Sequence, residues 1–336
     1  RIYDLPRQVV GDSILGQESS VGPLAMGDVD GDGDLDLLVG GRSQAGRYPE
    51  PATSLLMKNE GGRFGLWQRL EQVGMVSGAV FSDLDGDGKP ELILACDWGG
   101  ILVYRNEGGV LKPWNWPVQL ESTSNAPLSP LSQLTGWWNG VTTGDLDGDG
   151  RLDIVATNWG KNSRYRTSGS HPRKIYYGDL DGNGTQDLVE AYYEAALGQE
   201  VPDRGLKAVG AAMPFVLEKM GSYEAYGKAG VEEIYGEKLK RAGVVAARTL
   251  ATMVFLNRGN RWEGRELPVE AQWAPGFGVN VGDLDGDGKE DVFVSQNFYA
   301  VNAEVARCDG GRGLWLRGDG KGKLLAVAGG ESGVKV

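Results

Sequence analysis

Carboxylate side chains recur at a fixed spacing in five short segments of the sequence. Counted from its first Asp, each segment has a carboxylate or an amide at positions 1, 3 and 5, a carboxylate at position 9, and Gly at positions 4 and 6. Hard divalent cations bind six to eight oxygen atoms, which a tight loop with alternate inward side chains can provide. The predicted side-chain ligands are Asp28, Asp30, Asp32 and Asp36; Asp83, Asp85, Asp87 and Glu91; Asp145, Asp147, Asp149 and Asp153; Asp179, Asp181, Asn183 and Asp187; and Asp283, Asp285, Asp287 and Asp291.

Position 7 of each loop is predicted to add its backbone carbonyl oxygen, whatever side chain it carries. Glycine at positions 4 and 6 permits the backbone conformations that wrap a chain around an ion. Because so many neighbouring carboxylates would repel one another without a cation, the sequence predicts calcium, with up to five ions bound. Asn183 lacks a charge, so the fourth site is predicted to be the weakest. The position-7 residues are Asp34, Lys89, Arg151, Thr185 and Lys289.

The net charge of −12 over 336 residues bears on the partners of the chain. No basic stripe is available to neutralise phosphates, which excludes nucleic acid as a predicted partner. Five calcium ions would offset most of this negative charge. No apolar run approaches the roughly 18 residues that a membrane-spanning helix needs, so no membrane span is predicted.

The EF-hand is the other calcium motif with oxygens at positions 1, 3 and 5 and Gly at position 6. It requires a bidentate Glu at position 12 and flanking helices. Position 12 is Glu only in the fourth segment, where it is Glu190; the other segments have Val39, Leu94, Ala156 and Val294. Short β-rich apolar runs leave every segment, so each loop is predicted to join two antiparallel strands.

On these loops the chain resembles the FG-GAP/VCBS repeat family of integrin-type propellers and many secreted bacterial proteins. It is similar in particular to large FG-GAP-like proteins with an ASPIC-type C-terminal segment, although that segment is absent here. The resemblance implies an all-β fold, a β-propeller of about six or seven blades in the complete ring. It covers nearly the whole chain, which we expect to be a single propeller domain over residues 1–336 or an excerpt of one.

The spacing of the loops predicts two irregularities in the blades. Residues 54–64 and 251–262 read as hairpins that would complete a blade. Only 34 residues separate Asp145 from Asp179, so the third repeat is predicted to lack a normal second hairpin. The long gap before Asp283 contains an Ala-, Glu- and Lys-rich stretch over residues 199–245, predicted to be a short helical insertion within a blade.

Four aromatic residues follow the loops at equivalent distances, and we expect them at the opposite end of the strands. Aromatic rings near amides and carboxylates suit the binding of sugars or peptides. The alternative is that these rings cap the core between blades. The residues are Trp98, Trp159, Tyr193 and Phe298.

The function predicted from these features is that of a calcium-stiffened binding or adhesion module for a protein or carbohydrate ligand. The expected location is extracellular, at the cell surface or periplasmic, where calcium is abundant. The alternative function is that of a structural subunit bound to neighbouring subunits in a larger surface complex or filament. No HExxH, GxSxG or P-loop motif is present, so the sequence predicts that the chain is not an enzyme.

Overall fold

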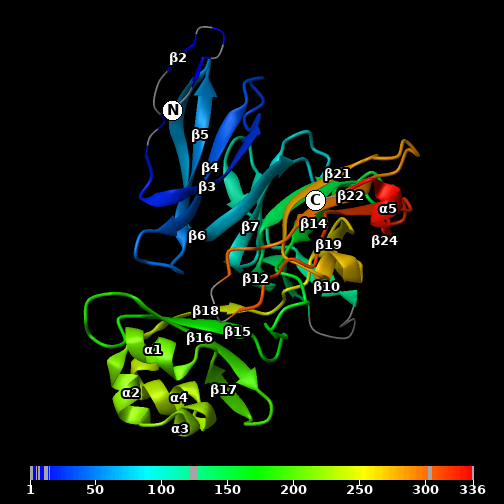
Figure 1. Cartoon of the computed structure of the whole chain (residues 1–336). Coiled ribbons are helices and arrows are strands. Elements are labelled where there is room, and N and C mark those ends of the chain that lie inside the picture. The colour runs from blue at the N-terminus through cyan, green and yellow to red at the C-terminus, as the bar shows by residue number, and fades with distance from the viewer. Residues whose placement is uncertain are drawn as a thin grey trace.

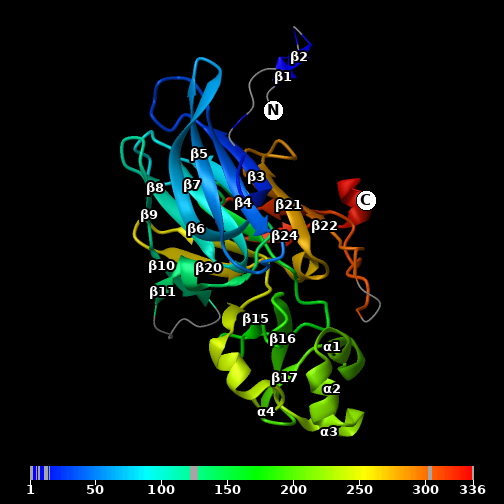
Figure 2. The same ribbon diagram turned by 90° about the vertical axis from the view of Figure 1, so that its left-hand side faces the viewer.

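The chain folds into several antiparallel sheets with few helices, so the predicted all-β class is confirmed. The computed structural model describes residues 3–4, 6, 8–10, 14, 16–121, 128–301 and 305–334. Figures 1 and 2 show a body of stacked sheets, from which a smaller unit with helices α1–α4 projects. No helix among the described residues is long and apolar enough to cross a membrane.

Four four-stranded units, which we call units one to four, make up the body. In each, neighbouring strands are antiparallel and the first two strands are joined by an acidic loop, as predicted. Unit one contains β3 (Ser19–Gly27), β4 (Asp36–Gln44), β5 (Ala52–Glu60) and the first part of β6 (Arg63–Ser82). Unit two contains the rest of β6, β7 (Glu91–Gly99), β8 (Ile101–Asn106) and β9 (Leu111–Pro113).

Units three and four follow the same pattern. Unit three contains β13 (Gly140–Gly144), β14 (Asp153–Thr157), β19 (Met253–Asn257) and β20 (Trp262–Glu266). Its outer edge is extended by β10 (Pro117–Leu120), parallel to β20, and by β11 (Ser129–Pro130). Unit four contains β21 (Gly276–Gly282), β22 (Asp291–Gln296), β23 (Leu314–Gly318) and β24 (Leu324–Ala326).

The fourth acidic loop belongs to a nested unit between β14 and β19. Its sheet has the order β17-β16-β15-β18, with β15 (Arg173–Gly178), β16 (Asp187–Glu194), β17 (Gln199–Pro202) and β18 (Gly243–Ala247). The third repeat therefore has a second hairpin, β19–β20, which pairs with β14 after the nested unit. The prediction that it lacks one was wrong, because spacing along the chain does not say which strands pair.

Short helices occupy most of the stretch predicted as an insertion. Ser222 caps α3 by accepting a hydrogen bond from the backbone N–H of Ala225, and Gly221 ends α2 in the left-handed conformation. The helices bury one apolar cluster against the nested sheet, including Val189, Val216 and Ile234. They are α1 (Leu206–Ala212), α2 (Pro214–Met220), α3 (Tyr223–Lys228), α4 (Val231–Tyr235) and η3 (Gly236–Arg241).

The remaining elements are short. They are β1 (Tyr3–Asp4), β2 (Val9–Val10), β12 (Gly136–Trp137), which pairs with β7, η2 (Leu131–Gln133), η4 (Val269–Gln272) and α5 (Gly329–Ser332).

Apolar side chains between neighbouring units form the core of the body. The cross-strand pairs Leu38–Leu56, Ile93–Val103 and Val155–Val254 each face the next unit and are at most 6% exposed. Their clusters bury the facing side chains of the following unit, and the first strands of successive units lie next to one another. The units therefore stack in the order one, two, three, four, with the nested unit outside this series.

Candidate metal centres

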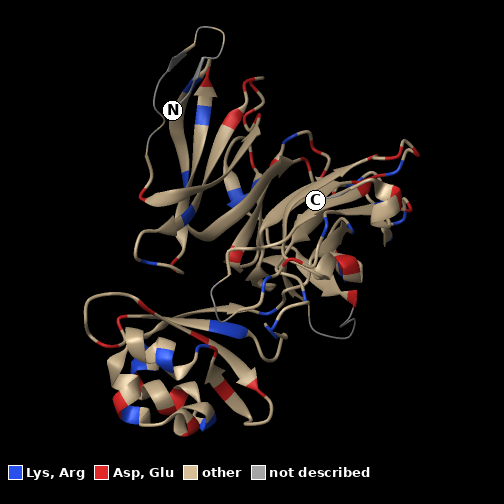
Figure 3. Ribbon diagram, in the orientation of Figure 1, with Lys and Arg blue, Asp and Glu red and all other residues tan. Residues whose placement is uncertain are grey.

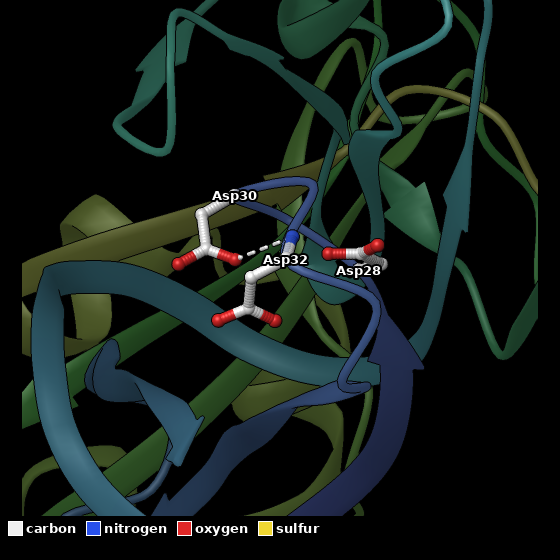
Figure 4. Close-up of side chains that lie close together, drawn as sticks. All are labelled: Asp28, Asp30 and Asp32. Atoms are coloured by element: carbon white, nitrogen blue, oxygen red, sulfur yellow. Dashed lines mark hydrogen bonds between the residues drawn. The ribbon is translucent and has the colours of Figure 1, made fainter.

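All five acidic loops bring carboxylate oxygens together. In every loop three carboxylate groups each place one oxygen so that the three lie within 4.8 Å of one another. Figure 4 shows the group of Asp28, Asp30 and Asp32 in the first loop. In the other loops the groups combine positions 1, 3 and 9: Asp83, Asp85 and Glu91; Asp145, Asp147 and Asp153; Asp179, Asp181 and Asp187; and Asp283, Asp285 and Asp291.

The position-1 carboxylate holds each loop in its tight conformation. Asp28 accepts hydrogen bonds from the backbone N–H groups of Gly31, at 2.8 Å, and Gly33, at 3.0 Å. Both glycines have positive φ, at 77° and 91°, a region that side-chained residues resist. The other four loops repeat positive φ at both glycines and the bond from position 6. This carboxylate is therefore fixed before any ion binds.

The position-9 carboxylate lies at the base of each loop and is buried. Asp36, Glu91, Asp153 and Asp291 have no exposed surface, and Asp187 is 7% exposed. Each accepts a hydrogen bond from the position-2 backbone N–H, at 2.9–3.2 Å. In the four body units a second bond comes from the end of the third strand, such as the Asn257 N–H to Asp153 at 2.8 Å.

Burial and neighbouring carboxylates make these acids hard to ionise without a cation. Desolvation is the main cause that raises the pKa of Glu91 to about 7, and Asp83 and Asp85 add to it. Desolvation likewise raises the pKa of Asp153 to about 7, with Asp147 and Asp149 contributing. The pKa values of Asp36 and Asp187 are raised for the same reason. A divalent ion among these oxygens would favour the ionised form.

Some predicted side-chain ligands lie outside the three-carboxylate groups. They are Asp36 in the first loop and the position-5 residues Asp87, Asp149, Asn183 and Asp287 in the other loops. The position-7 side chains turn to position 5 in three loops, where Lys89, Arg151 and Lys289 pair with Asp87, Asp149 and Asp287. Thr185 donates a hydrogen bond to Asn183, and Asp34 accepts one from the Gly61 N–H.

Basic side chains at the end of the third strand, or directly after it, are a feature that the sequence reasoning missed. In all four body units one of them pairs with the position-3 Asp, as in Arg317 with Asp285 at 2.8 Å. The sequence signal for these residues is a Lys or Arg directly before or after the residue whose backbone N–H donates a hydrogen bond to the position-9 carboxylate. In the described residues, Asp181 of the nested loop has no such pair. The other pairs are Lys58 with Asp30, Arg105 with Asp85 and Arg258 with Asp147.

The loops also bond to the next unit in the stack. The Asn106 side chain donates to the backbone carbonyl of Val29, at 2.7 Å, so unit two bonds the loop of unit one. The Gly322 N–H donates to the carbonyl of Leu146 at 3.0 Å, so unit four bonds the loop of unit three. The acidic loops thus belong to the contacts between units.

Clusters of oxygen donors with a buried carboxylate fit a hard divalent cation. Sulfur and imidazole ligands play no part in any described group. Figure 3 shows acidic residues at the tips of several of these loops. The structure therefore contains five sites that could hold a metal ion.

The four predicted ligand-binding aromatics are not arranged as one exposed platform. The Trp98 ring is 7% exposed and packs on Trp137, with centroids 4.9 Å apart. The Trp159 ring lies 5.1 Å from those of both Trp137 and Phe298. Tyr193 lies outside this cluster and stacks on His171 at 4.0 Å. Trp98 thus belongs to the core that joins the nested sheet to the body.

The comparison with family models matches one stretch of the chain. Residues 83–156 match the FG-GAP-like repeat. The matched stretch begins at the second acidic loop and contains the third, so it supports the predicted repeat family there. No curated protein matches the chain.

Among solved structures, the chain is similar to one titled exotype rhamnogalacturonan lyase YesX. The identity is 14% and the TM-score is 0.31, and the match covers 92% of this chain. The chain spans 57% of the length of that lyase. The finding goes against the prediction that the chain is not an enzyme, and that prediction is withdrawn. At this TM-score the likeness carries no argument about which activity, if any, the chain has.

Proposed function

We propose that the chain is a calcium-bound β-propeller module whose stacked units are its blades. The observation that carries this proposal is that all five loops contain a cluster of three carboxylates and also a buried position-9 acid, which belongs to the cluster in four of them. Four-stranded antiparallel units that stack with their first strands adjacent suit propeller blades. Oxygen-only ligands on a flexible loop suit calcium better than zinc or other soft-ligand metals.

In this proposal calcium stabilises the contacts between blades. The ion neutralises three or four carboxylates, including one that is fully buried, and the same loop accepts a bond from the next blade. Open loops of this kind suit the millimolar calcium found outside cells. We therefore place the protein outside the cell, at its surface or in the periplasm. Its role there is to bind a protein or carbohydrate ligand on a framework stiffened by calcium.

Metal analysis and thermal unfolding test the calcium proposal together. After dialysis against millimolar calcium, elemental analysis should find four or five calcium ions per chain. Excess chelator should lower the melting temperature by roughly ten degrees or more, since ligands that bind only the folded state stabilise it. An unchanged melting temperature together with no retained calcium would overturn the proposal.

A specific surface favours a second candidate, a structural subunit that associates through unit four. Position 2 is at most 1% exposed in the loops of units one to three, but Leu284 of unit four is 53% exposed. The pair Phe293–Trp315 occupies the place of Leu38–Leu56 and remains only half-buried. Terminal repeats that stay alone usually carry a polar outer face. Unit four instead exposes apolar groups on the face that, in units one to three, contacts the next unit of the stack.

Light scattering over a range of protein concentrations tests this second candidate. Association should be seen in the wild type and lost in Leu284→Asp and Phe293→Lys. Leu24→Asp is the matched control, since Leu24 is 60% exposed on unit one. A wild-type monomer at every concentration would rule out self-association through unit four.

A further inference from the structure

A large cavity lies where the nested unit joins unit three. Its volume is about 1050 Å³. Its lining comes from residues 118–120 and 129–135, from residues 160–169 before the nested sheet, from residues 248–253 after it, and from Glu266. The two linking segments of the nested unit therefore form two of its walls. The nested unit projects below the body in Figures 1 and 2, with its linkers at the junction.

Two arginines in the cavity wall have no carboxylate partner among the described residues. Arg166 donates to the backbone carbonyl of Ser163, at 2.8 Å, and Arg248 donates to that of Gly169, also at 2.8 Å. Both side chains belong to exposed residues that line the cavity. Both arginines thus lie in the wall of one cavity in a chain of net charge −12. Guanidinium groups held by neutral carbonyls keep their full charge for a ligand.

The remaining charges of the cavity nearly cancel. Lys161 pairs with both carboxylate oxygens of Glu266, at 2.6 and 2.7 Å. Glu266 is the only acid among the lining residues that the structure describes. The cavity is therefore positive because of Arg166 and Arg248, and an anionic ligand would be favoured there.

Neutral polar groups in the same wall indicate that the anionic ligand also carries hydroxyl groups. The Thr135 hydroxyl is buried and has no hydrogen-bond partner among the described residues, although buried hydroxyls almost always have one. The Thr135 carbonyl accepts bonds from the backbone N–H groups of Arg248, at 2.8 Å, and Thr249, at 3.1 Å, so the Thr135 backbone lies beside that of Arg248. Ser132, Thr167 and Thr249 add further hydroxyl groups to the lining.

We propose that this cavity binds an acidic oligosaccharide. Arg166 and Arg248 bind its carboxylates, since a guanidinium matches a carboxylate with two parallel hydrogen bonds. The hydroxyl side chains, Thr135 among them, bind the sugar hydroxyls, and the apolar lining residues Leu134 and Leu250 contact the sugar rings. An acidic peptide has the charge but few hydroxyl groups, so the lining favours a sugar. This inference rests on the proposed function, because it names a ligand for the proposed binding module. Its test is separate from the calcium test, because the cavity residues are not calcium ligands.

Calorimetry with two matched sugars tests the proposal. The probes are cellotetraose and its fully carboxylated counterpart, in which each glucose is replaced by glucuronic acid, both added to calcium-saturated protein. The acidic sugar should bind, and the neutral one should bind at least roughly tenfold more weakly. Arg166→Gln and Arg248→Gln should each weaken acidic-sugar binding by roughly tenfold, because each removes charge-assisted hydrogen bonds. Arg248→Lys should recover only part of the loss, since Lys lacks the planar fork.

Arg261→Gln is the matched control, because Arg261 is an exposed arginine outside the cavity with no ion pair among the described residues. Acidic sugars also bind free calcium, but that background is the same for every variant. Equal binding of both sugars, or an equal loss in Arg261→Gln, would overturn the proposal. So would an acidic hexapeptide that binds more tightly than the sugar. If the protein bound no calcium, only the calcium proposal would be overturned, because acidic-sugar binding by the arginine variants and the wild type could still be compared.

Discussion

The side-chain amide of Asn257 donates a hydrogen bond to the backbone carbonyl of Leu84, at 2.9 Å and across 173 residues of chain. Asn257 ends β19, the strand that resumes unit three after the nested unit, and Leu84 is position 2 of the second acidic loop. The same amide donates to Leu152 of its own unit, at 3.2 Å. One fully buried side chain therefore connects an acidic loop to the hairpin of the next unit.

Replacement of Asn257 by Ala should destabilise the protein strongly. The change leaves buried carbonyl groups without donors, which costs roughly 2 kcal/mol or more of unfolding free energy. Urea unfolding in saturating calcium measures this loss. Asn59→Ala is the control, since Asn59 is only half-buried and donates its side-chain amide to Leu35 of its own unit. A loss for Asn59→Ala as large as for Asn257→Ala would contradict the role assigned to the inter-unit bond.

The stability of the calcium-free protein should fall as the pH rises towards neutrality. The folded-state pKa values of Glu91 and Asp153 are about 7, above the ordinary values of 4.5 and 3.8. A pKa raised by folding adds stability below the unfolded value, and this is lost as the pH rises through the folded value. Calcium requires the ionised form, so its stabilising effect should grow over the same range.

Melting curves at about pH 5.5 and about pH 8, with and without calcium, check this dependence. The shift in melting temperature on adding calcium should be clearly larger at the higher pH. Glu91→Gln should flatten the pH dependence of the calcium-free protein and reduce the calcium effect. A calcium shift that is equal at both pH values would show that these acids are not ligands.

The nested loop should lose its ion first as calcium is lowered. Asn183 offers an amide where the other loops have a carboxylate, and Asp187 is the only position-9 acid with measurable exposure. Asn183→Asp adds a negative charge and should raise the affinity of that site by roughly fivefold to tenfold. Native mass spectrometry during a calcium titration measures the last ion to bind. If another loop lost its ion before the nested loop did, the prediction that the nested site is the weakest would be wrong.

Trp98→Ala should act on stability rather than on ligand binding. The ring is buried against Trp137, so its removal leaves a cavity and costs roughly 3–5 kcal/mol. Its backbone φ of 54° is unusual for a bulky residue, and Trp98→Gly would relieve that strain while losing the same ring. Thermal melts compare the two variants. If Trp98→Ala weakened sugar binding but left the melting temperature unchanged, Trp98 would have a ligand-binding role instead.

The acidic loops could be recognised from the sequence because their signal is local. Asp28, Gly31, Gly33 and Asp36 lie within nine residues, and the hydrogen bonds that shape the loop stay within that span. The antiparallel strands on both sides follow from the same local pattern. Repetition of the loops then made the family resemblance visible, and the family model supports it over residues 83–156.

The nested unit and the aromatic cluster could not be placed in this way. Ile154 pairs with Phe255 across a hundred residues, and no local pattern distinguishes this pairing from one within the nested sheet. Equivalent distances from the loops did put Trp98, Trp159 and Phe298 in one region. Whether a ring faces solvent depends on what covers it, and Trp137 comes from a separate strand.

Strand β6 is unbroken from Arg63 to Ser82 and serves two units in turn. As far as Gly74 it pairs with β5 at the edge of unit one, and from Met75 it pairs with β7 in unit two. Units one and two therefore cannot swing apart as separate bodies without breaking a strand. A force applied to unit one would pass straight into unit two, whereas the nested unit shares no strand with unit one or unit two and contacts the body through its two linking segments and the core around Trp98 and Trp137. Movement of the nested unit against the body would have to separate this side-chain core, but it would not break a strand as movement between units one and two would.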